Sequence, residues 1–222
     1  MRIAKSKDYA IVTGDVVGSS ELAAAQRRKL NAVMAGVSKE LKRAFKDAVP
    51  LPAAVFRGDS WQLLVEHPAQ ALRVALYYRA SLRAATPAGI DTRLVIAVGR
   101  IDFIPGTRVA EGDGPAYRLS GRALQAMVRR ERMRFVYPSH PAERPLALIV
   151  HLLDGLVMRW SDKQSLAVSG ALRGWNQEKI ASKSWSDPIS QQAVAQHLDR
   201  AGWSYVAAGL EYFEETLATN AK

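Results

Sequence analysis

The chain contains no cysteine and no long run of apolar residues. Without cysteine the protein can form neither a disulfide nor a thiolate-bound metal site, which fits a reducing compartment. The longest apolar run, Leu146 to Val150, is far too short to span a bilayer. The opening segment MRIAKSKDYAIV also lacks the apolar core and the small-residue cleavage site of a signal peptide. We therefore predict a cytoplasmic protein.

Histidine is scarce too, and its positions do not indicate a metal site. The four histidines are His67, His140, His151 and His197. None of them lies at metal-ligand spacing from another, so we expect surface or capping roles for most of them.

Acidic residues are outnumbered, and the imbalance is confined to one part of the chain. The sequence has 31 Lys and Arg against 21 Asp and Glu, a net charge of +10. Residues 144–222 contain eight basic and eight acidic residues, so the whole excess lies in the first 143 residues. A basic excess of this size favours polyanionic partners, either nucleotides or nucleic acid.

The stretch from Tyr9 to Ser20, YAIVTGDVVGSS, has the strongest functional pattern in the chain. Its apolar, β-branched residues predict a buried strand, and Asp15 interrupts that strand. Gly18 then breaks the strand, and Ser19 and Ser20 are good N-caps for the helical pattern that follows. A carboxylate beside free helix N–H groups could hold a metal and a triphosphate. The alternative is an ordinary turn in which Asp15 is a local cap.

Short strands and amphipathic helices alternate along the next hundred residues. We expect helices at 19–45, 68–85 and 116–130, strands at 53–56, 61–65 and 91–99, and a hairpin return at 100–109. The order β-α-β-β-α-β predicts an α+β fold of ferredoxin-like or palm type, with an antiparallel sheet and helices on one face. In that topology the first and third strands are neighbours.

This topology brings two acids together. Asp15 ends the first strand, and Asp59 lies in the hairpin before the third strand. Two carboxylates a few ångströms apart repel unless a cation lies between them. We therefore predict a Mg²⁺ or Mn²⁺ site formed by Asp15, Asp59 and the adjacent Val16. The alternative is two unrelated turn aspartates.

The composition changes after residue 137. Pro138, Pro141 and Pro145 mark a linker at 138–145, which predicts a domain at 1–137 and a small all-α domain at 146–222. A short helix, a turn at 184–188 and a helix capped by Ser190 have the pattern of a helix-turn-helix. The DNA-contacting residues would be Ser190, Gln191, Gln192, Gln196 and His197. Ala193, Val194 and Leu198 would pack inward.

The segment from about Tyr9 to Arg130 resembles the class III nucleotidyl cyclases. That family has an aspartate, two aliphatic residues, Gly and Ser or Thr at the end of its first strand, as in Asp15-Val-Val-Gly-Ser-Ser20 here. Its second metal aspartate follows a glycine, as Asp59 follows Gly58. Its later glycine-started motif is similar to the segment from Gly114 to Arg122.

The resemblance implies a role for each matched residue. Asp15 and Asp59 would hold two metal ions, and the backbone of Gly18, Ser19 and Ser20 would bind phosphates. Arg122, with Arg118, would stabilise the transition state, and Glu111 would recognise the base. The family acts as a head-to-tail homodimer, so a homodimer is implied here. Two departures stand out: Arg118 replaces a catalytic Asn, and Val55 stands where many members have a base-recognising Lys.

With TGDVVGSS near its N-terminus and a helix-turn-helix pattern near its C-terminus, the chain is similar across most of its length to the SatD-like bacterial proteins, a cyclase-like domain family. We therefore expect a cytoplasmic regulator that binds or converts a nucleoside triphosphate and that could bind DNA. One alternative is a nucleotide sensor without catalysis, which the changes at Val55 and Arg118 favour. Another is a protein-interaction module, which the zero net charge of residues 144–222 favours.

Overall fold

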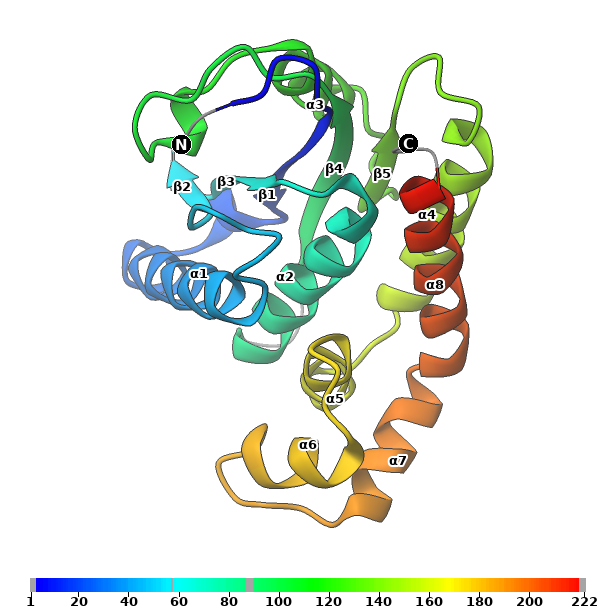
Figure 1. The fold of residues 1–222 in the computed structure, drawn as a ribbon. Helices are drawn as coiled ribbons and strands as arrows, with labels where there is room; N and C mark the ends of the chain where they lie inside the picture. Colours follow the sequence, from blue (N-terminus) through cyan, green and yellow to red (C-terminus); the bar gives the residue numbers. More distant parts are fainter. Residues whose placement is uncertain (1–2, 57, 87–89, 220–222) are drawn as a thin grey trace.

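The computed structural model describes residues 3–56, 58–86 and 90–219. A five-stranded mixed sheet has the order β2-β3-β1-β4-β5 (Figure 1). The strands are β1 (Tyr9–Val16), β2 (Ala54–Phe56), β3 (Ser60–Val65), β4 (Thr92–Gly99) and β5 (Met133–Val136). β5 runs parallel to β4, and the other neighbouring pairs are antiparallel. The predicted pairing of the first strand with Trp61–Val65 is confirmed.

Helices cover both faces of the sheet. On one face, α1 (Ala24–Ala44) and α2 (Ala71–Ala85) share a core with Ala10 and Val12 of β1. The alternate residues of β1 point the other way, where the Thr13 hydroxyl lies 2.8 Å from the Ser120 hydroxyl of α3 (Pro115–Gln125). The expectation of helices on one face is therefore wrong. α3 covers the opposite face, because β1 is apolar on both sides and needs burial on both.

The sequence pattern predicts most elements but misplaces some. The hairpin return expected at 100–109 is wrong: the segment forms a loop with one isolated bridge, between Phe103 and Asp113. β5 was not predicted. The helix expected from Ser19 begins as α1 at Ala24 instead, after the 3-10 turn η1 (Ser19–Glu21), because Leu22 and Ala23 are extended.

The helical segment contacts the sheet and its helices directly. Its helices are α4 (Glu143–Val157), α5 (Asp162–Leu172), α6 (Gln177–Lys183), α7 (Gln191–Arg200) and α8 (Trp203–Thr219). α5 packs on α2, α4 packs on β5, and α8 packs on the 3-10 turn η2 (Pro68–Gln70). One continuous core joins the first face of the sheet to α4–α8. The division at residues 138–145 stays a prediction.

A buried ion network joins the two parts of the chain. The fully buried Arg79 of α2 donates to Asp91, just before β4, at 2.7 and 2.9 Å, and to Asp154 of α4 at 2.6 Å. Burial disfavours the charged form of Arg79, but the two carboxylates outweigh it and raise the pKa of the guanidinium. Such a network makes the removal of any one member costly.

None of the described helices has both the length and the apolar character that a membrane span needs.

Candidate functional site

A cleft of about 420 Å³ opens at the carboxyl end of β1. It is lined by Asp15, Val16, Val17, Gly18, Ser19, Ser20, Asp59, Arg93, Val128, Arg129 and Arg132. The structure therefore brings together the predicted metal residues and the predicted phosphate-binding turn. Three arginines that were not predicted as site residues line the same cleft.

Asp15 is bound by an arginine of the neighbouring strand. It lies opposite Arg93 in the antiparallel pairing of β1 and β4. Arg93 Nε donates to Asp15 Oδ1 at 2.7 Å, and Arg93 Nη2 donates to Oδ2 at 2.8 Å. The bonds to Asp15 raise the pKa of Arg93 further above its ordinary high value, so this guanidinium stays charged. Both side chains are partly exposed to the cleft.

A chain of two hydrogen bonds fixes the backbone of Asp15. Trp61 Nε1 donates to the Thr92 hydroxyl at 2.9 Å, and that hydroxyl donates to the Asp15 carbonyl at 2.6 Å. A Cβ added to Gly14 would lie 2.6 Å from both the Trp61 ring and the Arg93 carbonyl. Only glycine allows this close packing, which fixes the direction of the Asp15 side chain.

Asp59 approaches Asp15 from the β2–β3 turn. Asp15 pairs with Ser60, and the Val16 N–H donates to the Asp59 carbonyl at 3.1 Å. The Asp59 carboxylate accepts a short hydrogen bond from the Ser19 hydroxyl and a bond of 3.3 Å from the Ser60 hydroxyl. The predicted juxtaposition of the two acids at one end of neighbouring strands is therefore present.

The turn between the two acids presents backbone amides. Gly18 has a φ of 74°, a left-handed conformation that favours glycine. The bonds that close η1 run from the Glu21 N–H to the Gly18 carbonyl and from the Leu22 N–H to the Ser19 carbonyl. The first amides of such a turn have no partner within it, so those of Gly18 to Ser20 can donate to an anion.

The far wall of the cleft comes from the loop between α3 and β5. It contributes Arg129, Arg132 and the exposed apolar residue Val128. The buried Asp154 holds this loop in place, because its Oδ2 accepts from the Arg132 N–H at 2.8 Å and from the Met133 N–H at 3.1 Å. The buried ion network of Arg79 therefore also supports the wall of the cleft.

The cleft is built for charged oxygen ligands. It combines two carboxylates, turn amides and three guanidinium groups, and one of the guanidinium groups is paired with Asp15. Arginines and turn amides bind phosphate oxygens. Two carboxylates are the ligands that Mg²⁺ uses together with substrate phosphates.

The donor set fits such an ion in chemistry, but Arg93 occupies both oxygens of Asp15. The two bonds leave one lone pair on each oxygen, so a metal at Asp15 would have to share the carboxylate with Arg93 or displace it. Within the described residues, no three His, Asp or Glu side chains gather as a metal centre.

The other predicted cyclase residues lie away from this cleft. Arg118 of α3 donates to Asp113 at 2.8 Å and is 3.4 Å from Asp102, and Arg122 is exposed on the same helix. Glu111 pairs with Arg108 at 3.0 Å. Among the described residues that line the cleft, none comes from the segment between Glu111 and Arg122. Within one chain, the structure does not bring these residues to Asp15.

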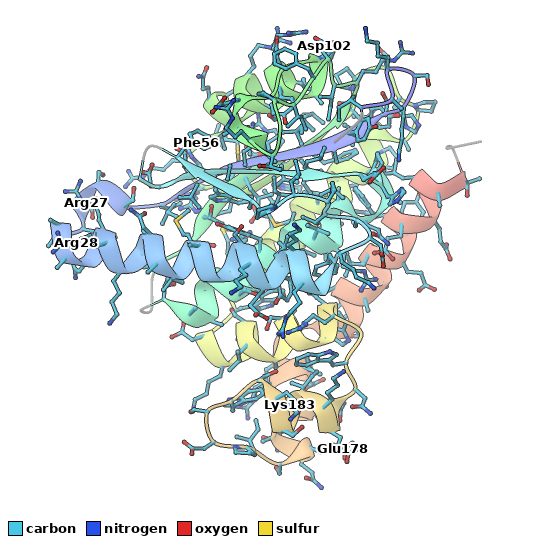
Figure 2. All side chains as sticks on the ribbon, turned by 60° about the vertical axis from the view of Figure 1, so that its left-hand side comes forward. Arg27, Arg28, Phe56, Asp102, Glu178 and Lys183 are labelled. Atoms are coloured by element: carbon cyan, nitrogen blue, oxygen red, sulfur yellow. The ribbon has the colours of Figure 1, made fainter. Side chains whose placement is uncertain are left out.

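None of the predicted DNA-binding residues lines the cleft. They lie on α7 and at its N-cap, α7 packs on α6, and Figure 2 shows α6 at the opposite end of the molecule from Asp102. The Ser190 hydroxyl accepts from the Ala193 N–H at 3.1 Å and caps α7, as predicted. Gln191, Gln192 and Gln196 are exposed, while Val194 and Leu198 are buried. His197 stacks on Trp185, with ring centroids 6.0 Å apart. The connection at 184–190 is longer than the usual helix-turn-helix turn of about 3–4 residues.

A signal for Arg93 was present in the sequence. The strand DTRLVIAVG contains one arginine among apolar residues, and a charge in such a strand needs a partner. The register of β1 and β4 identifies that partner as Asp15. Arg129 and Arg132 belong to a charged run whose composition resembles a solvated helix end, so composition alone does not assign them to a site.

The comparisons with known proteins give limited information. No protein-family model matches the chain, and no curated protein matches it. The resemblance to the SatD-like proteins therefore stays a prediction. Among solved structures, the chain is similar to the guanylyl cyclase Cya2, with 14% identity and a TM-score of 0.42, over 58% of this chain and 74% of that one. This likeness is weak, so function is inferred from the cleft itself.

Proposed function

We propose that the cleft at the end of β1 binds the phosphates of a nucleoside triphosphate together with a divalent cation. The observation that supports this most is the composition of the cleft: two carboxylates, a glycine turn with free amides and three arginines face one cavity. The basic excess of the first 143 residues favours the approach of a polyanion.

Each part of the cleft has a distinct task in this proposal. The amides of Gly18, Ser19 and Ser20 bind one phosphate group, and Arg129 and Arg132 neutralise the others from the far wall. A Mg²⁺ or Mn²⁺ ion would be held by Asp15, Asp59 and the backbone of Val16. When bound, the ion supplies positive charge that offsets the phosphate oxygens.

Arg93 links the free and bound states of the cleft. Without ligand, its guanidinium neutralises Asp15. A phosphate is the other partner that a guanidinium binds with two donors. Arg93 therefore exchanges Asp15 for phosphate, and Asp15 becomes available to a cation.

The cleft supports binding more directly than catalysis. Arg118 is paired with Asp113, and Arg122 lies on the same helix outside the cleft. For cyclase activity these side chains would have to come from a second subunit, as the resemblance to class III cyclases implies. We therefore place a nucleotide sensor first and a nucleotidyl cyclase second.

Measurement of product formation distinguishes a nucleotide sensor from a nucleotidyl cyclase. Wild type, Asp15→Asn and Arg122→Gln are incubated with ATP or GTP and Mn²⁺, and cyclic and linear products are measured beside nucleotide affinity. A cyclase loses rate with little loss of affinity in Arg122→Gln, because that charge acts on the transition state. A sensor binds nucleotide and gives no product in any variant. Absence of nucleotide binding by wild type would overturn both the sensor and the cyclase proposals.

We also propose that α7 contacts DNA. The supporting observation is that Gln191, Gln192 and Gln196 are exposed, while Val194 and Leu198 fix the opposite side of the helix. Exposed glutamines on a helix can bind adenine edges in the major groove. Residues 144–222 have no net positive charge, so the basic first part of the chain would supply most phosphate contacts.

A further inference from the structure

The outer side of α4 and α8 carries large apolar side chains that the core does not use. Leu148 and Leu152 of α4 are 57% and 60% exposed, and Tyr205 and Tyr212 of α8 are 71% and 48% exposed. We refer to these four residues as the α4–α8 face. Exposed apolar groups gathered on neighbouring helices are typical of an interaction surface.

These residues belong to one continuous surface. A Cβ added to Gly209 would lie 3.2 Å from Leu153, and one added to Gly202 would lie 3.9 Å from Leu156, so α4 and α8 pack in opposite directions. Leu148 and Leu152 are four residues apart and Tyr205 and Tyr212 are seven, so each pair shares one side of its helix. Figure 1 shows α8 at the outer edge of the molecule, beside α4.

The inner sides of the same helices already form the core. The buried residues are Leu146, Val150, Leu153 and Val157 of α4 and Val206, Leu210, Phe213 and Leu217 of α8. Arg73 of α2 also holds α8 through Glu214, at 2.6 Å. The α4–α8 face is therefore presented by fixed helices, and the fold does not need it for its own stability.

The four residues of the face are uncharged, and charged residues lie around it, including the exposed Glu211 just before Tyr212 on α8. From Pro145 to Met158 the ionisable residues are His151 and the buried Asp154. Arg159 lies in the turn just after α4, beyond its C-cap Met158, and Glu215 follows Tyr212 by three residues on α8. Because the helices are antiparallel, the cation and the anion lie at opposite ends. Both are exposed, and within the described residues neither has an ion-pair partner.

This arrangement is self-complementary. A two-fold axis through the middle of the face places Arg159 of one copy against Glu215 of the other, at both ends. The basic excess lies outside residues 144–222, so two copies of charge +10 meet through the segment that has no net charge. An acidic partner protein would gain little from this uncharged surface, which favours a second copy as its occupant.

We propose that the α4–α8 face is the interface of a homodimer with two-fold symmetry. Leu148, Leu152, Tyr205 and Tyr212 form its centre, and two Arg159–Glu215 pairs flank them. This surface differs from the head-to-tail contact implied by the cyclase resemblance, which would involve α3. It does not depend on nucleotide binding.

Sedimentation equilibrium of the full chain over a range of concentrations tests the proposal. Wild type should sediment at twice the chain mass of 24.4 kDa. Leu152→Glu should be monomeric, because it buries a charge at the centre of the interface. Phe103→Glu is the matched control: it changes an apolar residue that is 52% exposed elsewhere, and it should stay dimeric. Circular dichroism confirms that each variant is folded.

Charge reversal then tests the orientation. Arg159→Glu and Glu215→Arg should each weaken the dimer by about tenfold, and the double variant should recover affinity. A monomeric wild type at high concentration would overturn the proposal, as would a dimer that survives Leu152→Glu. A double variant no tighter than the single variants would exclude the antiparallel pairing and the interface as described.

Discussion

The guanidinium of Arg93 donates to both carboxylate oxygens of Asp15, at 2.7 and 2.8 Å, across neighbouring strands. The guanidinium uses one lone pair on each carboxylate oxygen, so a metal ion at Asp15 would have to share the carboxylate with Arg93 or displace it. In the function that we propose, Arg93 exchanges Asp15 for phosphate, and the cation enters with the phosphate. Substitution of Arg93 and substitution of Asp15 each test this relationship.

Arg93→Gln should raise the affinity of the cleft for Mn²⁺ alone and lower its affinity for triphosphate. The substitution frees Asp15 for the cation and removes a phosphate donor. Both affinities can be measured by calorimetry. Arg43→Gln removes one exposed cation paired with Glu40 on α1, so it controls for net charge and should change neither value. If Arg93→Gln leaves both affinities at wild-type values, then Arg93 does not control the cleft.

Asp15→Asn should remove the dependence of triphosphate binding on Mg²⁺. Without the ion, the variant should bind triphosphate more tightly than wild type, because a negative charge is lost and Arg93 is released. With the ion, wild type should bind more tightly than the variant. The measurement is a titration with and without Mg²⁺. Equal enhancement by Mg²⁺ in both proteins would show that the ion does not bind Asp15.

Arg79→Ala should reduce the free energy of unfolding by about 3–5 kcal/mol at pH 7, since it leaves the buried Asp154 without a guanidinium partner and Asp91 with Arg83 alone. Burial alone would raise the pKa of Asp91, but Arg79 outweighs it and holds the pKa below its usual value. The stabilisation by Asp91 is therefore complete above the unfolded pKa, near 4, and is lost as pH falls through the folded value.

Urea unfolding from pH 7 to pH 3 checks this prediction. The difference between wild type and Arg79→Ala should shrink toward the acid end, as Asp91 becomes protonated. Arg43→Ala, which breaks an exposed pair, should change stability by less than about 1 kcal/mol. A difference that stays constant with pH would mean that Asp91 does not gain its stability from Arg79.

A double variant of Gln191→Ala and Gln196→Ala should reduce sequence discrimination in DNA binding and leave the salt dependence unchanged. Base contacts would be lost, while the phosphate contacts of the basic first part of the chain remain. Competition binding with specific and random duplexes, at several salt concentrations, measures both quantities. If wild type does not bind DNA at low salt, α7 has another role.

Local patterns in the sequence correctly predict that Asp15 and Asp59 lie at one end of neighbouring strands. The apolar run from Tyr9 defines β1, and the turn before Trp61 defines the start of β3, so both acids fall at the ends of adjacent strands. The cap Ser190 also starts α7 where the sequence indicates. These features depend on residues close together in the chain.

The remaining features depend on partners far apart in the sequence. β5 is short, contains Arg134 and forms because it pairs in parallel with β4. Arg93 pairs with Asp15 across 78 residues, and Asp154 of α4 fixes the loop that carries Arg132. Local propensity does not carry such information, so the far wall of the cleft becomes visible only in the fold.

Nucleotide binding in the cleft is tested most directly by calorimetric titration of the full chain with GTP and with ATP in the presence of Mg²⁺. The same titration is repeated on Arg132→Gln and on the control Arg43→Gln. We predict one binding site per chain for a nucleoside triphosphate, a loss of affinity of at least about tenfold in Arg132→Gln, and wild-type affinity in Arg43→Gln. Absence of binding by wild type, or equal affinity in Arg132→Gln and wild type, would contradict the proposed role of the cleft.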